Sequence, residues 1–122
     1  MMTYDSLLND ALNNIPEFAA EYSKMVEKGY FDHETGNHII FSWAFVPLLA
    51  NAINEKNDRL VRKIFTFVES MASSNDNRIQ EVCDFTILEE LYDQFPISKL
   101  LPLLGENTRK GYLAISEYML PN

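Results

Sequence analysis

The clearest pattern of apolar and polar positions along the chain lies between Asp58 and Ala72. Its apolar residues recur three or four positions apart, which is the spacing of one stripe on an α-helix. They are Val61, Ile64, Phe65, Val68, Met71 and Ala72. Charged and hydroxyl side chains cover the opposite face, and Asn57 or Asp58 can cap the first turn. The pattern predicts an amphipathic helix over residues 58–72 that buries one face.

A second segment, from Asn77 to Gln94, is apolar around most of its circumference. Asp76 precedes it and suits a helix cap. A helix of this kind is usually covered on several sides, so we expect it to be the central helix of the fold. It also carries three acids, Asp84, Glu89 and Glu90. These side chains would need polar exits or basic partners, because an unpaired buried carboxylate is costly.

Five further helices are expected from the apolar spacing and from residues that favour helix ends. They span about residues 3–14, 16–28, 38–53 and 97–104, and the last begins near 106–108 and ends before Leu120-Pro121-Asn122. Pro16 suits the first turn of its helix, and Gly29 suits the position just beyond the helix end. Pro47 lies inside the helix over 38–53, so we expect a kink or break near residues 43–46.

Three aromatic residues could serve either the core or a binding surface. We expect Trp43 to lie in the core, with a surface binding anchor as the alternative. Tyr30 and Phe31 belong to the polar stretch 30–37 and are candidate anchors. For both of these, a side chain folded back on the core is the alternative.

The composition favours one all-α domain over residues 1–122. Hydrophobic residues make up 47% of the chain and aromatic residues 12%, which is enough for a core and argues against disorder. Four glycines and five prolines leave room for several helices, and no long strand-type alternation is present. We therefore expect about six to seven short antiparallel helices, stacked as α-hairpins.

The sequence carries no signal for export or for a membrane. Its N-terminus lacks a basic segment followed by an apolar run. The apolar stretch from Ile39 to Ile53 is too short to span a bilayer. The single Cys83 cannot form an internal disulfide and suits a small core residue in a reducing compartment. We expect a cytoplasmic protein.

Candidates for acid–base or metal chemistry gather only near His33 and His38. These histidines are five positions apart with Gly36 between them, whereas the zinc site of a protease helix needs a spacing of four. A solvated loop with a local capping role is favoured here over a metal site. The chain has no Gly-rich phosphate loop and no nucleophile motif. We expect no enzymatic activity, no cofactor and no metal.

The two helices over 58–94 resemble a helical repeat of the HEAT type. The resemblance rests on the run from Leu60 to Ala72, the turn around Asp76 and Arg78, and the run Thr86-Ile87-Leu88-Glu89-Glu90-Leu91. It implies that Asp76 and Arg78 tie the two helices together. Over about residues 40–92 the chain also resembles small, acidic bacterial proteins. Some of these look like immunity proteins of secreted toxins, including contact-dependent growth-inhibition toxins.

The resemblance implies an immunity protein that binds and neutralises a cognate toxin, with a nuclease as the expected class of toxin. Nucleases are commonly basic because they bind phosphates. The chain has a net charge of −8, which would steer a basic partner and repel nucleic acid and anionic membranes. The same charge also fits an ordinary acidic cytosolic protein. A helical scaffold or regulatory adaptor for another protein partner is the alternative function.

The residues expected to bind such a partner are acids. The first group decorates the two central helices and comprises Glu69, Glu81, Asp84, Glu89 and Asp93. The second group lies in the loop over 30–37 and comprises Asp32 and Glu34. For each of these acids, a solvated or capping role is the alternative.

Overall fold

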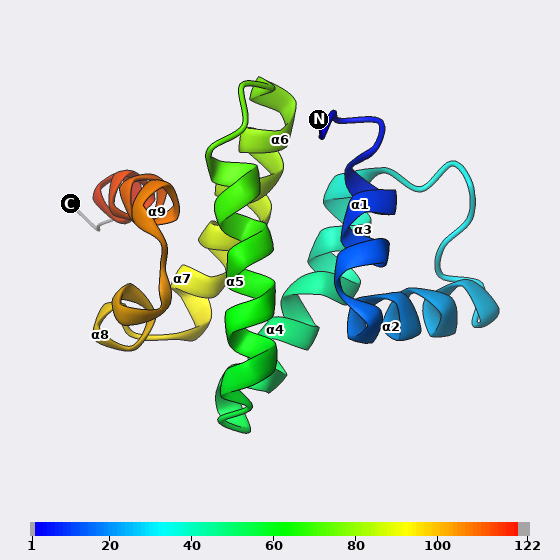
Figure 1. Ribbon diagram of the computed structural model, residues 1–122, viewed down its shortest axis with the longest axis horizontal. Helices are drawn as coiled ribbons and strands as arrows, with labels where there is room; N and C mark the ends of the chain where they lie inside the picture. Colours follow the sequence, from blue (N-terminus) through cyan, green and yellow to red (C-terminus); the bar gives the residue numbers. More distant parts are fainter. Residues whose placement is uncertain (1, 120–122) are drawn as a thin grey trace.

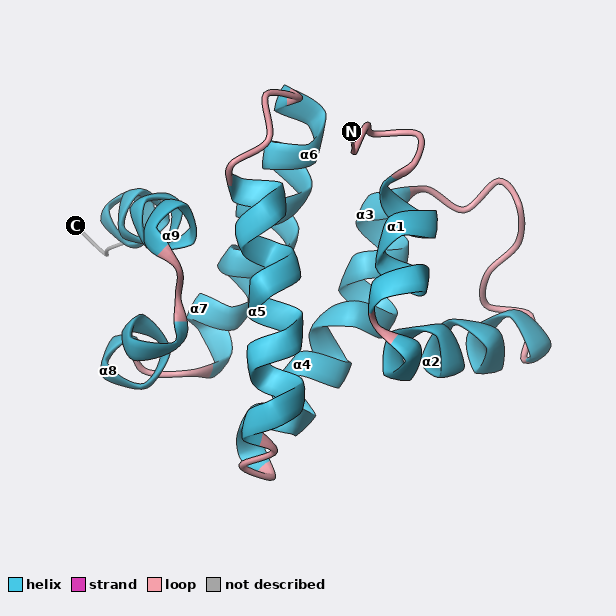
Figure 2. Ribbon diagram, viewed as in Figure 1, coloured by secondary structure: helices cyan, strands magenta, loops and turns pink. Residues whose placement is uncertain are grey.

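The computed structural model describes residues 2–119, and this part of the chain is helical without strands (Figures 1 and 2). Its helices are α1 (Leu7–Asn14), α2 (Pro16–Glu27), α3 (Asn37–Ile40), α4 (Val46–Asn54), α5 (Asp58–Ala72), α6 (Asn77–Glu81), α7 (Glu89–Gln94), α8 (Ile97–Leu100) and α9 (Glu106–Met119). Three short segments extend them: the π-helical η1 (Phe41–Phe45) and η2 (Val82–Leu88), and the 3-10 helix η3 (Leu101–Leu103). Since α3–η1–α4, α6–η2–α7 and α8–η3 are each continuous, the described chain has seven helices, which confirms the predicted all-α fold.

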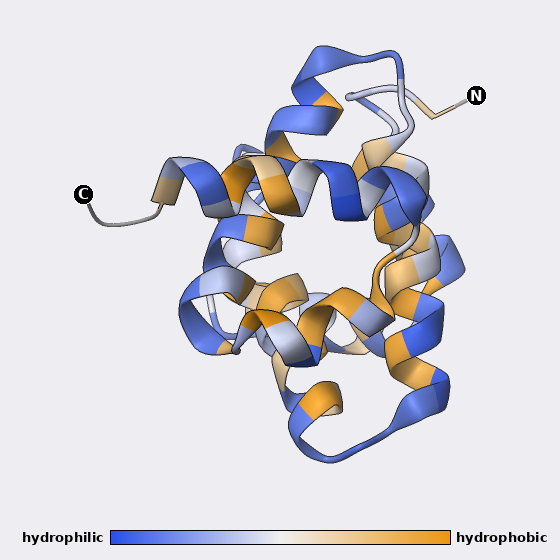
Figure 3. Ribbon diagram, turned by 90° about the vertical axis from the view of Figure 1, so that its left-hand side faces the viewer, coloured by the Kyte–Doolittle hydropathy of each residue, from blue (hydrophilic) through white to orange (hydrophobic). Residues whose placement is uncertain are grey.

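The helix α5 stands at the centre of the view in Figure 1 and has the bounds that its apolar stripe predicts. The Asn57 side chain caps it, since its Oδ1 accepts the Leu60 N–H at 3.3 Å. Short turns connect α5 to α4 before it and to α6 after it, so α5 is antiparallel to both. Most helices alternate hydrophobic and hydrophilic stretches, because each covers part of one core (Figure 3).

The helix over residues 37–54 breaks its regular hydrogen bonding where Pro47 predicts it. The Val46 N–H donates to the Phe41 carbonyl, five residues back, instead of the usual four. The break is therefore a π-helical widening over Phe41–Phe45. The prediction for Trp43 is wrong, because its side chain is 53% exposed. It lies on the helix face opposite to Phe41 and Phe45, which are fully buried.

The helix over residues 77–94 is central, as predicted. It packs against α5, α9 and the α3–η1–α4 helix, and Ile79, Cys83 and Leu91 are fully buried. Burial raises the pKa of the Cys83 thiol, as expected of a core cysteine. Phe85 departs from the prediction, since it is 57% exposed. It lies in the π-helical segment η2, which the sequence pattern does not reveal.

The remaining predictions concern the end of α2, the last helix and possible membrane-spanning segments. Gly29 follows α2 with φ +82°, and the N–H groups of Gly29 and Tyr30 close the helix end on the Val26 and Met25 carbonyls. In α9, Tyr112 and Ile115 are buried and Tyr118 is exposed. The expected helix end before Leu120-Pro121-Asn122 lies outside the described residues. No helix within residues 2–119 has the length and apolarity that crossing a membrane requires.

Candidate functional site

The two helices with π-helical segments lie side by side and run in the same direction, because both are antiparallel to α5. Two polar pairs join them. The Nδ1 atom of His38 lies 2.7 Å from the Thr86 hydroxyl. One turn further along, the Ser42 hydroxyl lies beside the Glu90 carboxyl. We call these four residues the polar seam.

One side of this seam faces the core and the other faces solvent. When two parallel helices meet along a seam, the residue just after a seam position on one helix points to the same side as the residue just before a seam position on the other. On the outward side these positions hold Ile39, Trp43, Phe85 and Glu89. We call them the π face. Ile39 is 46% exposed, and the three aliphatic or aromatic side chains share this side with a carboxylate.

The π face extends onto the loop that precedes α3. The Tyr30 ring, itself exposed, meets the Trp43 ring edge to face, with 6.5 Å between their centroids. Phe31 lies behind them and is buried, with its ring stacked on Tyr22. Of the two loop aromatics, Tyr30 therefore belongs to the surface and Phe31 to the core.

The π-helical segment η2 brings two of the predicted acids onto one side. In a regular α-helix, positions five apart diverge by about 140°. Here the Glu89 N–H donates to the Asp84 carbonyl, five residues back, so that Glu89 stacks one wide turn above Asp84. Both line a hollow of about 630 Å³ between η2–α7 and α9. The rest of its lining is Phe85, Gly111, Ala114, Ile115 and Tyr118.

Asp84 is partly buried in this hollow. Burial raises the pKa of its carboxyl above the ordinary value. Gly111 of α9 makes room for it, because a Cβ at this position would lie 2.8 Å from Asp84 Oδ1. Neither Asp84 nor Glu89 has an ion-pair partner in the described part of the chain. The hollow is thus acidic and uncompensated.

The other acids predicted to bind a partner lie in different settings. Glu81, in the second turn of the α6–η2–α7 helix, and Asp93, near its C-terminal end, are both exposed. Asp32 accepts the Glu34 N–H and the Thr35 hydroxyl, and the Glu34 N–H is the main cause that lowers its pKa. Asp32 therefore shapes its own loop. Glu34 is exposed beside His33, whose Nε2 lies 3.8 Å from its carboxylate.

Glu69 is engaged inside the fold. Its carboxylate accepts the backbone N–H groups of Asn107 and Thr108, at 3.0 and 2.9 Å, and also their side chains. These two residues form the first turn of α9, so Glu69 caps that helix from α5. Burial raises the pKa of Glu69, but the four hydrogen bonds outweigh it and the pKa is lowered. We do not retain Glu69 as a partner-binding residue.

The turn between α5 and α6 uses Asp76 and Arg78 differently from the HEAT-type resemblance. Asp76 caps α6 through the Arg78 N–H, and its other oxygen accepts the Tyr4 N–H at 3.1 Å. The Arg78 guanidinium lies 4.6 Å from the centre of the Tyr4 ring. The pair therefore fastens α6 to the segment before α1, instead of tying α5 to α6.

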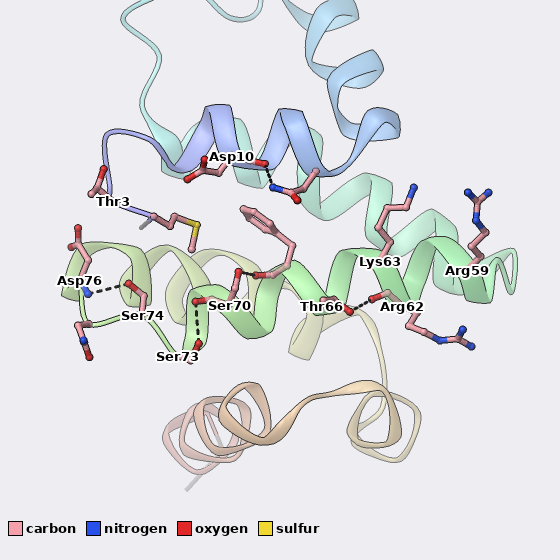
Figure 4. A pocket seen from close by; sticks show the side chains of 14 residues that line it. Thr3, Asp10, Arg59, Arg62, Lys63, Thr66, Ser70, Ser73, Ser74 and Asp76 are labelled. Atoms are coloured by element: carbon pink, nitrogen blue, oxygen red, sulfur yellow. Dashed lines mark hydrogen bonds between the residues drawn. The ribbon is translucent and has the colours of Figure 1, made fainter.

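A groove of about 1210 Å³ runs between α1 and α5 (Figure 4). Its basic end is formed by Arg59, Arg62 and Lys63, and Asp76 lies at the other end. Along it, the hydroxyls of Thr66, Ser70 and Ser73 donate to backbone carbonyls of α5. Lys63 is paired with Glu17 at 3.2 Å. The three hydroxyls and Lys63 therefore have partners within the chain, whereas the exposed Arg59 and Arg62 form no ion pair among the described residues.

His33 and His38 do not converge. His38 belongs to the polar seam, whereas the ring of His33 lies beside Glu34 in the loop. Within residues 2–119, no three side chains among His, Cys, Asp and Glu are grouped so that they could hold a metal ion.

The sequence predicts Asp84 and Glu89 as partner-binding acids and Tyr30 as a candidate anchor, and it gives a binding anchor as the alternative for Trp43. Ile39 and Phe85 were not singled out, because both belong to helices that are apolar around much of their circumference. The one available signal was Pro47, since a proline inside a helix favours a local widening before it. No comparable residue marks η2.

Comparison with known proteins gives a family and no function. A family model described as a domain of unknown function (DUF7674) matches residues 8–119. No curated protein matches the chain. No solved structure matches it either.

Proposed function

We propose that this chain, which belongs to the DUF7674 family, is an immunity protein that binds and neutralises a cognate basic toxin. In this proposal it acts without catalysis, by covering a surface of the toxin. The observation that carries it is the π face, where exposed apolar side chains of two helices share one side with the unpaired Glu89 carboxylate. We place the partner-binding acids on the α6–η2–α7 helix: Glu89 on the π face, Asp84 in the neighbouring hollow, and the exposed Glu81 and Asp93.

The apolar part of the π face supports a protein partner. Trp43, Phe85 and Tyr30 are each more than half exposed. Tryptophan and tyrosine are enriched among the few residues that carry most of the energy of an interface. Phe41 and Phe45 fill the core side of their helix, and Trp43 remains half exposed although its ring lies near Tyr30 and the buried Phe31. A bound partner would remove the exposed rings from water.

The charge of the chain supports a basic partner. With a net charge of −8, the protein attracts a positively charged surface over long range and raises the rate of association. A toxin that cleaves nucleic acid is commonly basic, since it must bind phosphates. An immunity protein gains from fast binding, because it must act before damage occurs. To meet a nuclease near nucleic acid, it would work in the cytoplasm.

A scaffold or adaptor for another protein is the second candidate function, and the π face would serve it equally well. The two candidates differ in the partner. An immunity protein protects the cell from one toxin, whereas an adaptor has no toxin to neutralise. Co-expression with the product of the adjacent upstream gene separates them. We expect that product to be toxic alone and harmless with this protein; a toxic product that this protein neither binds nor neutralises would overturn the proposal.

Substitutions then test the π face itself. We expect Trp43→Ala and Phe85→Ala each to weaken toxin binding by about 2 kcal/mol or more, which is about 30-fold. Ile97→Ala and Leu103→Ala are matched controls, because both side chains are exposed on the α8–η3 segment. Calorimetry measures the affinity of each variant, and its repetition at low and high salt measures how strongly the affinity depends on charge. Affinity lost equally in the controls, or unchanged between the two salt conditions, would contradict binding through an acidic aromatic face.

A further inference from the structure

We infer that the hollow between η2–α7 and α9 is a socket for one arginine side chain of the partner. This inference rests on the proposed function and names the chemical group that the acidic surface recognises. The socket is formed by two carboxylates, Asp84 and Glu89, two exposed aromatic rings, Phe85 and Tyr118, and an apolar floor at Ala114 and Ile115.

The first argument is the unpaired charge of Asp84. Its carboxylate is partly buried and has no ion-pair partner among residues 2–119. Removing a carboxylate from water without a counter-charge destabilises the free protein. A guanidinium that enters the hollow would supply the missing counter-charge. The cost of holding Asp84 in this position is then recovered on binding.

The second argument is the arrangement of the two acids. The hydrogen bond from the Glu89 N–H to the Asp84 carbonyl stacks these residues one wide turn apart on the same side of the helix. A planar guanidinium with five N–H donors can bond to two carboxylates at once, whereas an ammonium group acts as a point charge. No lysine, arginine or histidine lines the hollow to compete for them.

The third argument is the pair of aromatic rings. Tyr118 is 83% exposed and Phe85 is more than half exposed, and both line the hollow together with Ala114 and Ile115. Rings in this setting favour a guanidinium, which is weakly hydrated and stacks on aromatic faces. Gly111 completes the site, because it lets the Asp84 carboxylate lie close against the backbone of α9. The hollow therefore combines charge and stacking for one planar cation.

The test uses a small probe and the full-length protein. Nα-acetyl-arginine amide is titrated into isotope-labelled protein, and the ring signals of Phe85 and Tyr118 and the carboxyl signal of Asp84 are followed by NMR. We expect shifts at these residues that saturate at millimolar probe and weaken at high salt. Nα-acetyl-citrulline amide has almost the same shape without the charge, and we expect no saturable shift with it. Equal shifts with both probes, or none with arginine, would overturn the socket.

Two variants separate binding from folding. We expect Asp84→Asn to weaken binding of the arginine probe at least ten-fold and to raise the melting temperature of the free protein, since it removes an uncompensated buried charge. A structural role of Asp84 would lower the melting temperature instead and contradict the inference. Glu117→Gln is the control, because Glu117 is exposed on α9 but does not line the hollow. It should leave both measurements unchanged.

Measurements with the toxin distinguish failure of the arginine socket from failure of the immunity function. Suppose that the arginine probe binds in the hollow but the neighbouring gene product is neither bound nor neutralised. The socket then stands and the immunity function fails. Suppose instead that the toxin is neutralised equally by the wild type and by the Asp84→Asn, Glu89→Gln double variant. The immunity function then stands and the socket fails.

Discussion

At the N-terminus of α9 the capping group comes from another helix, because Gly105 has no side chain of its own. The Arg109 N–H donates to the Gly105 carbonyl, so Gly105 occupies the position where a serine or aspartate usually caps. A Cβ on Gly105 would lie 2.5 Å from Glu69 Oε1. The missing side chain therefore leaves space for the Glu69 carboxylate, which connects α5 to α9.

Substitution of Glu69 tests this cap. We expect Glu69→Ala to lower the free energy of unfolding by about 2–3 kcal/mol, because two backbone N–H groups and two side chains lose a charged acceptor. Gly105→Ala should destabilise in the same direction, since it displaces the carboxylate. Urea denaturation measures both, with Glu81→Ala as the exposed control. Wild-type stability in Glu69→Ala would show that the cap contributes nothing.

Lys56 lies in a backbone conformation that suits glycine. Its φ is +57°, and it ends the α3–η1–α4 helix in the same way that Gly29 ends α2. We expect Lys56→Gly to raise the free energy of unfolding by about 0.5–1 kcal/mol, because the strain of a side chain at positive φ exceeds the added flexibility of glycine in the unfolded chain. Lys56→Ala keeps the strain and serves as the control. If thermal denaturation shows that the Lys56→Gly variant is less stable than the Lys56→Ala variant, this explanation is contradicted.

At the scale of elements, the caps of α5 and α6 were predictable, whereas the start of α1 at Leu7, expected near residue 3, and the π-helical segment η2 were not. Asn57 and Asp76 cap α5 and α6 as expected, because a cap depends on a few consecutive residues. The π-helical segments depend on packing between helices that are distant in sequence. In each of the two helices the exposed ring, Trp43 or Phe85, lies within the π-helical segment. A regular helical period does not bring Asp84 and Glu89 onto one side, whereas η2 does.

The polar seam gives a prediction at this scale. Burial raises the pKa of Glu90, the Ser42 hydroxyl lowers it, and the charges of Asp93 and Glu89 raise it, so that the net shift is upward. The folded protein then binds this proton more tightly than the unfolded chain does, and ionisation at neutral pH is destabilising. We expect Glu90→Gln to raise the free energy of unfolding by a few tenths to about 1 kcal/mol. The glutamine can still bond to Ser42.

The control for this variant is Asp93→Asn, which removes one of the repelling charges but leaves Glu90 ionisable. We expect it to be less stabilising than Glu90→Gln at pH 7. At a pH below the ordinary range of glutamate, both advantages should disappear, because Glu90 is then protonated in the wild type as well. An advantage of Glu90→Gln that persists unchanged at acid pH would exclude the electrostatic explanation.

At the scale of the whole molecule, carboxyl groups of two opposite kinds act on stability. Burial raises the pKa values of Asp84 and Glu90. Hydrogen bonds outweigh burial at Glu69 and Asp76 and lower their pKa values. The first pair opposes the folded state at neutral pH, and the second pair supports it. The net charge of −8 adds a general repulsion that acidification relieves.

These opposite shifts predict a maximum in stability at mildly acidic pH. As the pH falls from 7, protonation of Asp84 and Glu90 in the folded state raises the melting temperature, because their pKa values exceed those of the unfolded chain. Below the ordinary carboxyl range, Glu69 and Asp76 must be protonated against their lowered pKa values, and stability is lost. We expect the maximum near about pH 5. In the Asp84→Asn, Glu90→Gln double variant, we expect a smaller rise in melting temperature as the pH falls from 7, and the same loss at more acidic pH. Melting curves across a pH series measure both changes. A wild-type melting temperature that falls steadily from pH 7 would contradict the assignment of these two buried acids.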